Sequence, residues 1–234
     1  MARPGGCLVN DGRSSKVHRF DDPGQTCFLK RYRYRKIHWR HCLEKSQVVR
    51  EYENLERIRQ ADLGCRTIEI LAFGERRRWR VLLDAFLLSR AVPGGRRLSL
   101  FLAERPADPR RAEVVAKLIA FGARVIASRL AITDLFFRNL VVVPDTAELY
   151  LLDVQHCRTD PRRAARKSWP QFWADCEIFL TPAEKAAAAE QLAASLPEPF
   201  SALAERAAAF IPKEEKRRRQ ELALAATGPE PADA

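Results

Sequence analysis

The sequence contains no long hydrophobic run, no closely spaced pair of cysteines and no excess of acidic residues. Its apolar stretches are all shorter than the ~20 residues that a membrane-spanning helix needs, so we expect no such helix. The N-terminal segment MARPGGCLVNDGR lacks the apolar core of a secretory signal peptide. The six cysteines, none in a CxxC or zinc-type spacing, favour reduced, buried thiols in a cytoplasmic protein.

Basic residues outnumber acidic ones. The 41 lysines and arginines stand against 30 aspartates and glutamates, which gives a formal net charge of +11. Such a charge favours an anionic partner, which could be a nucleic acid, an anionic membrane face or a phosphorylated substrate. With 47% hydrophobic and 30% charged residues, the chain of 234 residues is expected to be globular, with one large domain or two lobes.

Turn signals and apolar spacing divide the first part of the chain into strands around one helix. Residues 7–34 are predicted to form three short antiparallel strands, with a turn at DDPGQ. Residues 44–60 predict a helix, because Val48, Tyr52 and Leu55 recur at steps of three and four residues. The segments IEILAFGE and WRVLLDAFLLS predict two further strands, joined by the charged turn ERRR.

Residues 90–97, RAVPGGRR, interrupt this pattern with proline and glycine and are predicted to be a hinge. Beyond the hinge the pattern is mainly helical, except for two short strands, LVVV and LYLLDV, separated by the turn PDTAE. The last residues begin as a charged helix that is expected to fray into a disordered tail. The chain is therefore predicted to be an α+β protein with lobes at 1–89 and 98–211 and a tail at 212–234.

A glutamate lies on the apolar face of the predicted helix. Glu51 is three residues after Val48 and four before Leu55, so its carboxylate points inward and needs a partner. Lys30, on a predicted strand of the same lobe, can supply one, since a Lys–Glu ion pair orients the amine towards phosphates. The alternatives are an arginine of the same helix for Glu51 and a solvated position for Lys30.

Three more polar residues stand beside apolar strands in the second lobe. Asp134 and Asn139 have the spacing D-x-x-x-x-N, and Asp153 follows two leucines. Turn and cap chemistry would explain the first two, and a strand-end carboxylate the third. Hard oxygen ligands also suit Mg²⁺. The ordered set supplies what phosphoryl transfer requires: a cation for the nucleotide phosphates, oxygen ligands for magnesium, and a carboxylate beside the attacking hydroxyl.

The segments FLK at 28–30, REYENL at 50–55, TDLFFRNLVV at 133–142 and LLD at 151–153 together resemble the protein-kinase-like fold. In particular, they resemble the bacterial lipopolysaccharide kinase family, the Kdo and heptose kinases of the core oligosaccharide. The resemblance covers residues 8 to about 160. It implies a bilobal α+β fold, with a small antiparallel-sheet N-lobe carrying one helix and a mainly helical C-lobe.

The resemblance also implies roles for these residues. Lys30 would contact the ATP phosphates and act in catalysis, and Glu51 would pair with it. Asp134 would be the catalytic base that accepts the proton of the sugar hydroxyl. Asn139 and Asp153 would hold Mg²⁺.

The phosphate-covering loop departs from the protein-kinase pattern. By the resemblance, DGRSS at 11–15 would cover the phosphates through the backbone of Gly12, Ser14 and Ser15, yet it lacks G-x-G-x-x-G. LLSRAVPGG would bind the adenine. The family usually has a histidine two residues before the catalytic aspartate, where this chain has Ile132. A catalytically degenerate, kinase-like binding protein is therefore an alternative.

The leading hypothesis is an ATP-dependent kinase that phosphorylates a hydroxyl of a lipopolysaccharide core sugar, Kdo or heptose. The basic and aromatic run KRYRYRKIHWRH, 30–41, would face an anionic lipid-linked saccharide or the cytoplasmic face of the inner membrane. The same composition suits nucleic acid, but that reading ranks last because it leaves Asp134 and Asp153 unexplained. A kinase for another small-molecule or protein acceptor stays open, since a fold does not name its acceptor.

Overall fold

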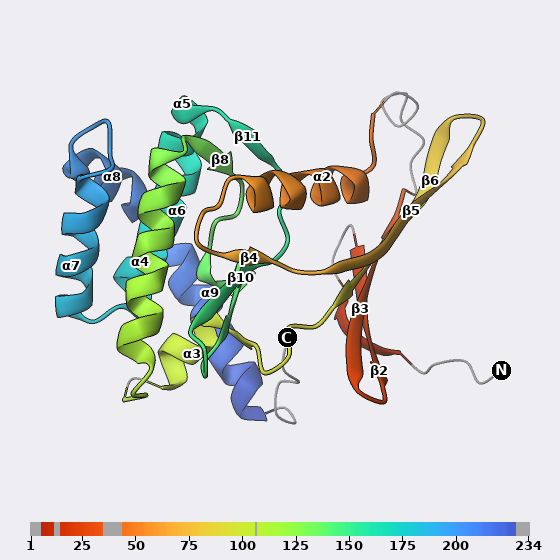
Figure 1. Cartoon of the computed structure of the whole chain (residues 1–234), viewed down its shortest axis with the longest axis horizontal. Coiled ribbons are helices and arrows are strands. Elements are labelled where there is room, and N and C mark those ends of the chain that lie inside the picture. Colours follow the sequence, from red (N-terminus) through yellow and green to blue (C-terminus); the bar gives the residue numbers. More distant parts are fainter. Residues whose placement is uncertain (1–5, 12–14, 35–43, 106, 228–234) are drawn as a thin grey trace. The chain divides into compact units, whose positions relative to one another are not determined.

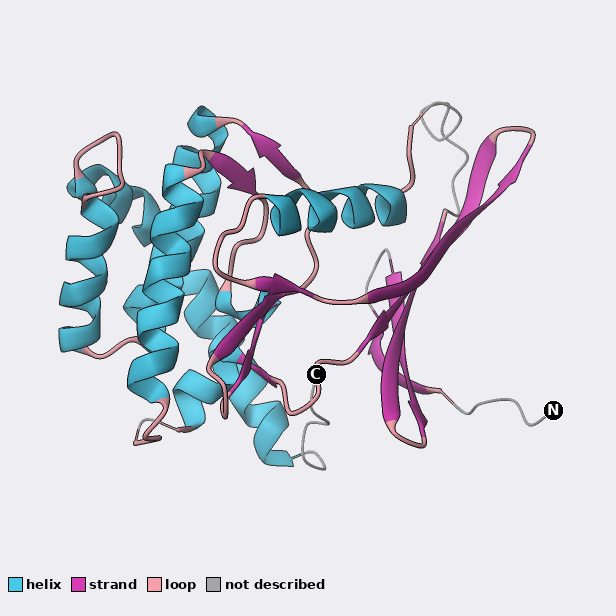
Figure 2. Cartoon of the chain, viewed as in Figure 1, coloured by secondary structure: helices cyan, strands magenta, loops and turns pink. Residues whose placement is uncertain are grey.

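The computed structural model describes residues 6–11, 15–34, 44–105 and 107–227. The chain forms two compact units, and each is described separately (Figures 1 and 2). The first contains a sheet and most of one helix, and the second is mainly helical, so the predicted α+β class is confirmed. The first unit comprises Met1–Glu56 and Ile68–Ala91, and the second comprises Arg57–Thr67 and Val92–Ala234.

The unit boundary near residue 91 falls in the predicted hinge, but the segment after the first helix belongs to the second unit. Its backbone explains why. The short strand β4 (Arg66–Thr67) pairs in parallel with β10 (Glu148–Leu151), and the Arg57 side chain donates to the carbonyl oxygen of Cys157. Contacts this distant in sequence leave no local pattern.

The first unit is built on a five-stranded antiparallel sheet in the order β1-β2-β3-β6-β5. Gly24, at φ +82°, makes the turn predicted at DDPGQ, where a positive φ suits glycine. A small core joins the sheet residues Tyr32, Ala85 and Leu87 to Val48 of the helix that follows residue 46. The strands are β1 (Cys7–Asp11), β2 (Ser15–Asp22), β3 (Gln25–Arg33), β5 (Ile70–Arg78) and β6 (Val81–Arg90).

The turn predicted at ERRR lies further along the chain. Those residues extend β5 to Arg78, and the turn is made by Trp79 and Arg80, with φ of 51° and 67°. The charged residues fit an extended strand because Arg76 pairs with Asp84 across the hairpin. The charged residues ERRR therefore belong to an exposed strand and not to a turn.

Helix α2 (Gln47–Gln60) follows the predicted apolar spacing, and Val48, Leu55 and Ile58 are at most 1% exposed. It begins three residues later than expected. The Ser46 hydroxyl accepts a hydrogen bond from the Val49 backbone N–H, which is the usual N-cap contact.

The second unit packs helices around two small sheets, β4-β10-β9-β7 and β11-β8. Gly122 lets α4 approach α6 closely, because a Cβ there would lie 2.5 Å from the Phe172 ring. The strands not yet given are β7 (Arg96–Arg97), β8 (Leu130–Ile132), β9 (Leu140–Val143) and β11 (Cys157–Thr159). The helical segments are α3 (Leu98–Glu104), α4 (Arg111–Ala127), η1 (Phe137–Asn139), α5 (Pro161–Arg163), η2 (Ala164–Ser168), α6 (Trp169–Phe179), α7 (Pro182–Ala193), α8 (Phe200–Ala208) and α9 (Ile211–Thr227).

The charged helix expected from residue 212 is α9, which runs to Thr227, and the last seven residues of the expected tail lie outside the described residues. One side of this helix contacts the rest of the second unit. Arg218 donates to the Ile178 carbonyl oxygen at 3.1 Å, and its guanidinium lies 5.2 Å from the centre of the Phe179 ring. Within the described residues, no helix is long and apolar enough to cross a membrane.

Candidate active site

A buried ion pair joins β3 to α2 in the first unit. The Lys30 Nζ lies 3.2 and 3.1 Å from the two carboxylate oxygens of Glu51, which is 2% exposed. The Tyr32 hydroxyl donates to the same carboxylate at 3.2 Å, and the Lys30 ammonium lies 5.4 Å from the centre of the Tyr32 ring. A cation and a hydroxyl together satisfy a carboxylate that could not be buried alone.

The strand pairing fixes the position of the lysine. Lys30 stands opposite Val17 of β2 on one side and Leu87 of β6 on the other, so its strand is central in the sheet. A central strand and an ion pair to a helix hold the amine in a defined place, as a phosphate-binding cation requires.

In the second unit, Asp134 and Asn139 close one tight loop between β8 and β9. The Asp134 carbonyl oxygen accepts from the Phe136 N–H and from the Asn139 Nδ2, both at 2.8 Å. Asp134 has φ 60°, a left-handed conformation that aspartate and asparagine adopt more readily than most residues. Because the Asn139 nitrogen faces this carbonyl, the amide oxygen is the atom of this side chain that could bind a metal ion.

The sheet register brings Asp153 to the same edge as Asn139. Leu151, the last residue of β10, pairs with Leu140, the first residue of β9, and Asn139 directly precedes that pair. The Leu152 N–H then donates to the Asn139 carbonyl oxygen at 2.8 Å. Asp153 therefore follows β10, rather than ending it as predicted, and is half-buried.

A buried aspartate that sequence reasoning missed binds the backbone of the loop between Asp134 and Asn139. The Asp175 Oδ2 accepts the Phe137 N–H at 2.5 Å, and Asp175 is 2% exposed. Burial raises the pKa of the Asp175 carboxyl to about 8. Its only local signal is an acid within the apolar helix WPQFWADCEIF.

The neighbouring loop residue is held by the C-terminal helix. The Arg138 Nη1 donates to the Glu214 carboxylate of α9 at 2.5 Å, and Glu214 is 6% exposed. The Arg138 guanidinium also stacks 4.0 Å from the centre of the Phe136 ring. Two consecutive residues between Asp134 and Asn139 are thus fixed by two different helices.

Ile132, at the position where the sequence resemblance leads one to expect a histidine, is a buried strand residue. It is 1% exposed and pairs with Cys157 of β11, and the adjacent Thr133 N–H donates to the His156 carbonyl oxygen at 2.9 Å. Backbone pairing therefore anchors the start of the loop without an imidazole.

The predicted phosphate-covering loop is only partly described. Gly12 and Ser14 lie outside the described residues. Ser15 begins β2 and pairs with Tyr32 of β3.

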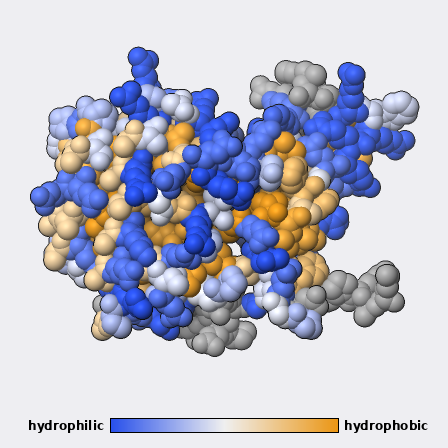
Figure 3. Space-filling model, in the orientation of Figure 1, coloured by the Kyte–Doolittle hydropathy of each residue, from blue (hydrophilic) through white to orange (hydrophobic). Residues whose placement is uncertain are grey.

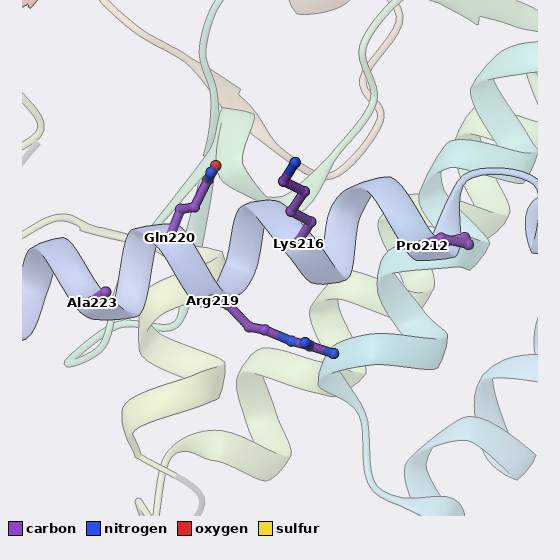
Figure 4. Close-up of a pocket in the computed structure, with 5 residues that line it drawn as sticks. All are labelled: Pro212, Lys216, Arg219, Gln220 and Ala223. Carbon is purple, nitrogen blue, oxygen red and sulfur yellow. The ribbon is translucent and has the colours of Figure 1, made fainter.

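A groove of about 470 Å³ runs along α9, and none of its lining residues is among the site residues predicted from the sequence. Its charged lining side chains are Lys216 and Arg219, which extend to different sides of the helix (Figure 4). The remaining lining residues are Pro212, Gln220 and Ala223.

The fold, with an ion-paired strand lysine in one unit and a D-x-x-x-x-N loop in the other, defines a protein of the protein-kinase-like class. A solved structure titled "WaaP in complex with acyl carrier protein" shares this fold, with a TM-score of 0.57 and 16% identity; the match covers 91% of this chain and 87% of that chain. Residues 13–172 match the Lipopolysaccharide kinase (Kdo/WaaP) family, and the chain belongs to that family. No curated protein matches it. The protein is therefore a kinase, a phosphotransferase that acts on a hydroxyl group.

Proposed function

We propose that the protein transfers phosphate from ATP, with Mg²⁺, to a hydroxyl of a Kdo or heptose residue in the lipopolysaccharide core. The observation that carries this proposal is the shared position of Asn139 and Asp153 at one sheet edge, with Asp134 bound to Asn139. Family membership supports a lipopolysaccharide core kinase, and the choice of sugar belongs to the proposal.

The metal site fits magnesium. The Asn139 amide oxygen and the Asp153 carboxylate are hard oxygen ligands, and Mg²⁺ typically takes one or two such groups besides phosphates and water. When bound, the ion would neutralise charge on the transferred phosphate. The Asn139 nitrogen is already bound to the Asp134 carbonyl oxygen, so the amide oxygen is the atom that would be left to bind the ion.

Asp134 is assigned as the base. Its carboxylate would accept the proton of the sugar hydroxyl as the oxygen attacks the γ-phosphate. Lys30, held by Glu51, would bind the nucleotide phosphates.

A catalytically degenerate binding protein is the second candidate, and Ile132 is the observation that favours it. The loop is nevertheless held by β8–β11 pairing, Asp175 and Glu214. These contacts support turnover without the histidine, so the kinase remains the leading proposal.

The acceptor is proposed to be an anionic, lipid-linked saccharide, met at the cytoplasmic face of the inner membrane. The net charge of +11 supports an anionic partner. The structural neighbour was solved with an acyl carrier protein. The groove along α9, lined by Lys216 and Arg219, makes an acyl carrier protein a second candidate partner. Salt-sensitive binding that is lost in Lys216→Glu is the test. Nucleic acid ranks below both.

The test is phosphate transfer from γ-labelled ATP to a panel of deacylated core saccharides that contain Kdo, heptose or neither. Label in a Kdo or heptose saccharide alone is the expected result. If Mg²⁺–ATP raises the unfolding temperature but no acceptor is labelled, the degenerate binding protein is the better account. Label in other sugars or in proteins would replace the acceptor assignment.

A further inference from the structure

The β5–β6 hairpin ends in an exposed tryptophan flanked by arginines. Trp79 is 87% exposed, the highest value for a large hydrophobic side chain among the described residues. Single exposed apolar side chains are ordinary. A tryptophan, however, has the largest ring to bury, and here almost none of it is covered within the chain.

The tip extends past the sheet that supports it. The ladder between β3 and β6 ends at the pair Arg33–Asp84, whereas β5 and β6 remain paired as far as Arg78–Val81. Figure 1 shows this end of the hairpin (yellow) reaching beyond β3, and Figure 3 shows the surface there to be strongly hydrophilic. The turn is thus presented outwards from the first unit.

The charges of the hairpin are unevenly balanced. Towards its base, Arg76 pairs with Asp84, and Arg77 pairs with Glu75 at 2.8 Å. At the tip, Arg78 and Arg80 are exposed, and the described part of the chain offers neither an acidic partner. Among the described residues of the hairpin, the two arginines without a described acidic partner are therefore those next to Trp79.

The backbone of the turn is strained. Trp79 and Arg80 have φ of 51° and 67°, where a side chain crowds the backbone. Asn-Gly is the favoured pair for a two-residue turn of this kind. Folding alone does not require a strained turn that exposes the Trp79 ring. Backbone strain of this kind concentrates at sites with a function.

We propose that this tip anchors the protein to a membrane, with the Trp79 ring in the interface of an anionic bilayer and Arg78 and Arg80 on anionic headgroups. Tryptophan prefers membrane interfaces, because its ring is apolar with one polar N–H. Arginines near the cytoplasmic leaflet are attracted by its negative potential. A convex tip reaches a flat bilayer, whereas single-stranded nucleic acid is bound in a groove with several stacking aromatics. The inference rests on the proposed function only in that a lipid-linked acceptor requires a membrane.

The test is flotation of the full chain with vesicles of phosphatidylcholine, with and without phosphatidylglycerol. The substitutions Trp79→Asn and Arg80→Gly, made one at a time, each introduce a residue that this kind of turn favours, so the hairpin should persist. Arg78→Gln removes the second charge, and Arg166→Gln, at an exposed arginine in the second unit, is the matched control.

Binding is expected only with phosphatidylglycerol. Each tip arginine substitution should lower partitioning about fivefold, and Trp79→Asn about tenfold or more. Arg166→Gln should leave partitioning near that of the unchanged protein. Brominated lipids should quench fluorescence in the unchanged protein but not in Trp79→Asn.

Three results would overturn the anchor: equal binding to both vesicle types, undiminished binding of Trp79→Asn, and tip-dependent binding to a single-stranded RNA homopolymer but not to vesicles. Activity on a deacylated, water-soluble acceptor separates the two proposals. Phosphorylation without tip-dependent vesicle binding overturns the anchor alone. Tip-dependent vesicle binding without phosphorylation of any core saccharide overturns the proposed function alone.

Discussion

At the scale of single residues, the Glu51 carboxylate accepts hydrogen bonds from the Lys30 ammonium and the Tyr32 hydroxyl. Its inward position on α2 could be predicted from apolar spacing, and so could its need for a cation. The role of Asp175 could not, because its partner is a backbone N–H 38 residues away and no local pattern records that contact.

We expect Glu51→Gln to lower turnover more than it lowers stability. The amide can still accept from Tyr32, but it no longer holds the Lys30 amine by charge, so turnover should fall about ten- to hundredfold. The free energy of unfolding should fall by about 1–3 kcal/mol. Steady-state kinetics measures the turnover, and urea unfolding measures the free energy of unfolding. Glu53→Gln, a half-exposed position on the same helix, is the control, and an equal loss in both variants would refute the assigned role of the pair.

The Asp175 carboxyl predicts a pH dependence of stability. Its pKa of about 8 lies above the ordinary value of 3.8, so the folded state holds a proton that the unfolded chain has released. The contribution of this carboxyl to stability is therefore complete below pH 3.8. It falls progressively as pH rises from 3.8 to the folded-state pKa of about 8. The slope across this window is about 1.4 kcal/mol per pH unit.

Asp175→Asn should flatten that slope while keeping an oxygen that accepts the Phe137 N–H. Urea unfolding between pH 4 and pH 9 would measure it, with Asp145→Asn, an exposed position, as the control. A slope unchanged by Asp175→Asn would show that the carboxyl is ionised in the folded protein.

At the scale of elements, α9 is bound to the second unit by a few paired side chains. Its composition alone predicts a solvated, fraying segment, since nothing in EEKRRRQ distinguishes the buried Glu214 from the exposed Glu215. The partner of Glu214 is Arg138, in a loop that precedes it by 76 residues. The β5–β6 turn was misplaced for a related reason, because cross-strand pairing, not composition, decided it.

Glu214→Gln is expected to loosen the loop without removing a catalytic group. We expect kcat to fall about ten- to hundredfold, with the KM for ATP nearly unchanged. Steady-state kinetics well below the unfolding temperature would show the split, and Glu215→Gln is the matched control. A change in KM alone would contradict a positioning role for α9.

At the scale of the whole molecule, the order of strands, helix, strands and then helices could be predicted, because apolar periodicity and turn residues are local. The assignment of Arg57–Thr67 to the second unit could not, since it depends on the pairing of Arg66 with Tyr150. The candidate site could be predicted from the sequence because each of its residues is a polar residue at a position where the local pattern favours an apolar one. Asp134, Asn139 and Asp153 are polar residues beside apolar strands, and Glu51 is an acid on an apolar stripe.

Removal of the proposed base tests the central claim most directly. Asparagine tolerates the left-handed backbone at position 134, so Asp134→Asn should fold, bind Mg²⁺–ATP and show an unchanged unfolding temperature. The rate of labelled phosphate transfer to a core saccharide should fall about 100- to 10,000-fold, with Asp145→Asn as the control. Transfer by Asp134→Asn at the full rate would contradict the account.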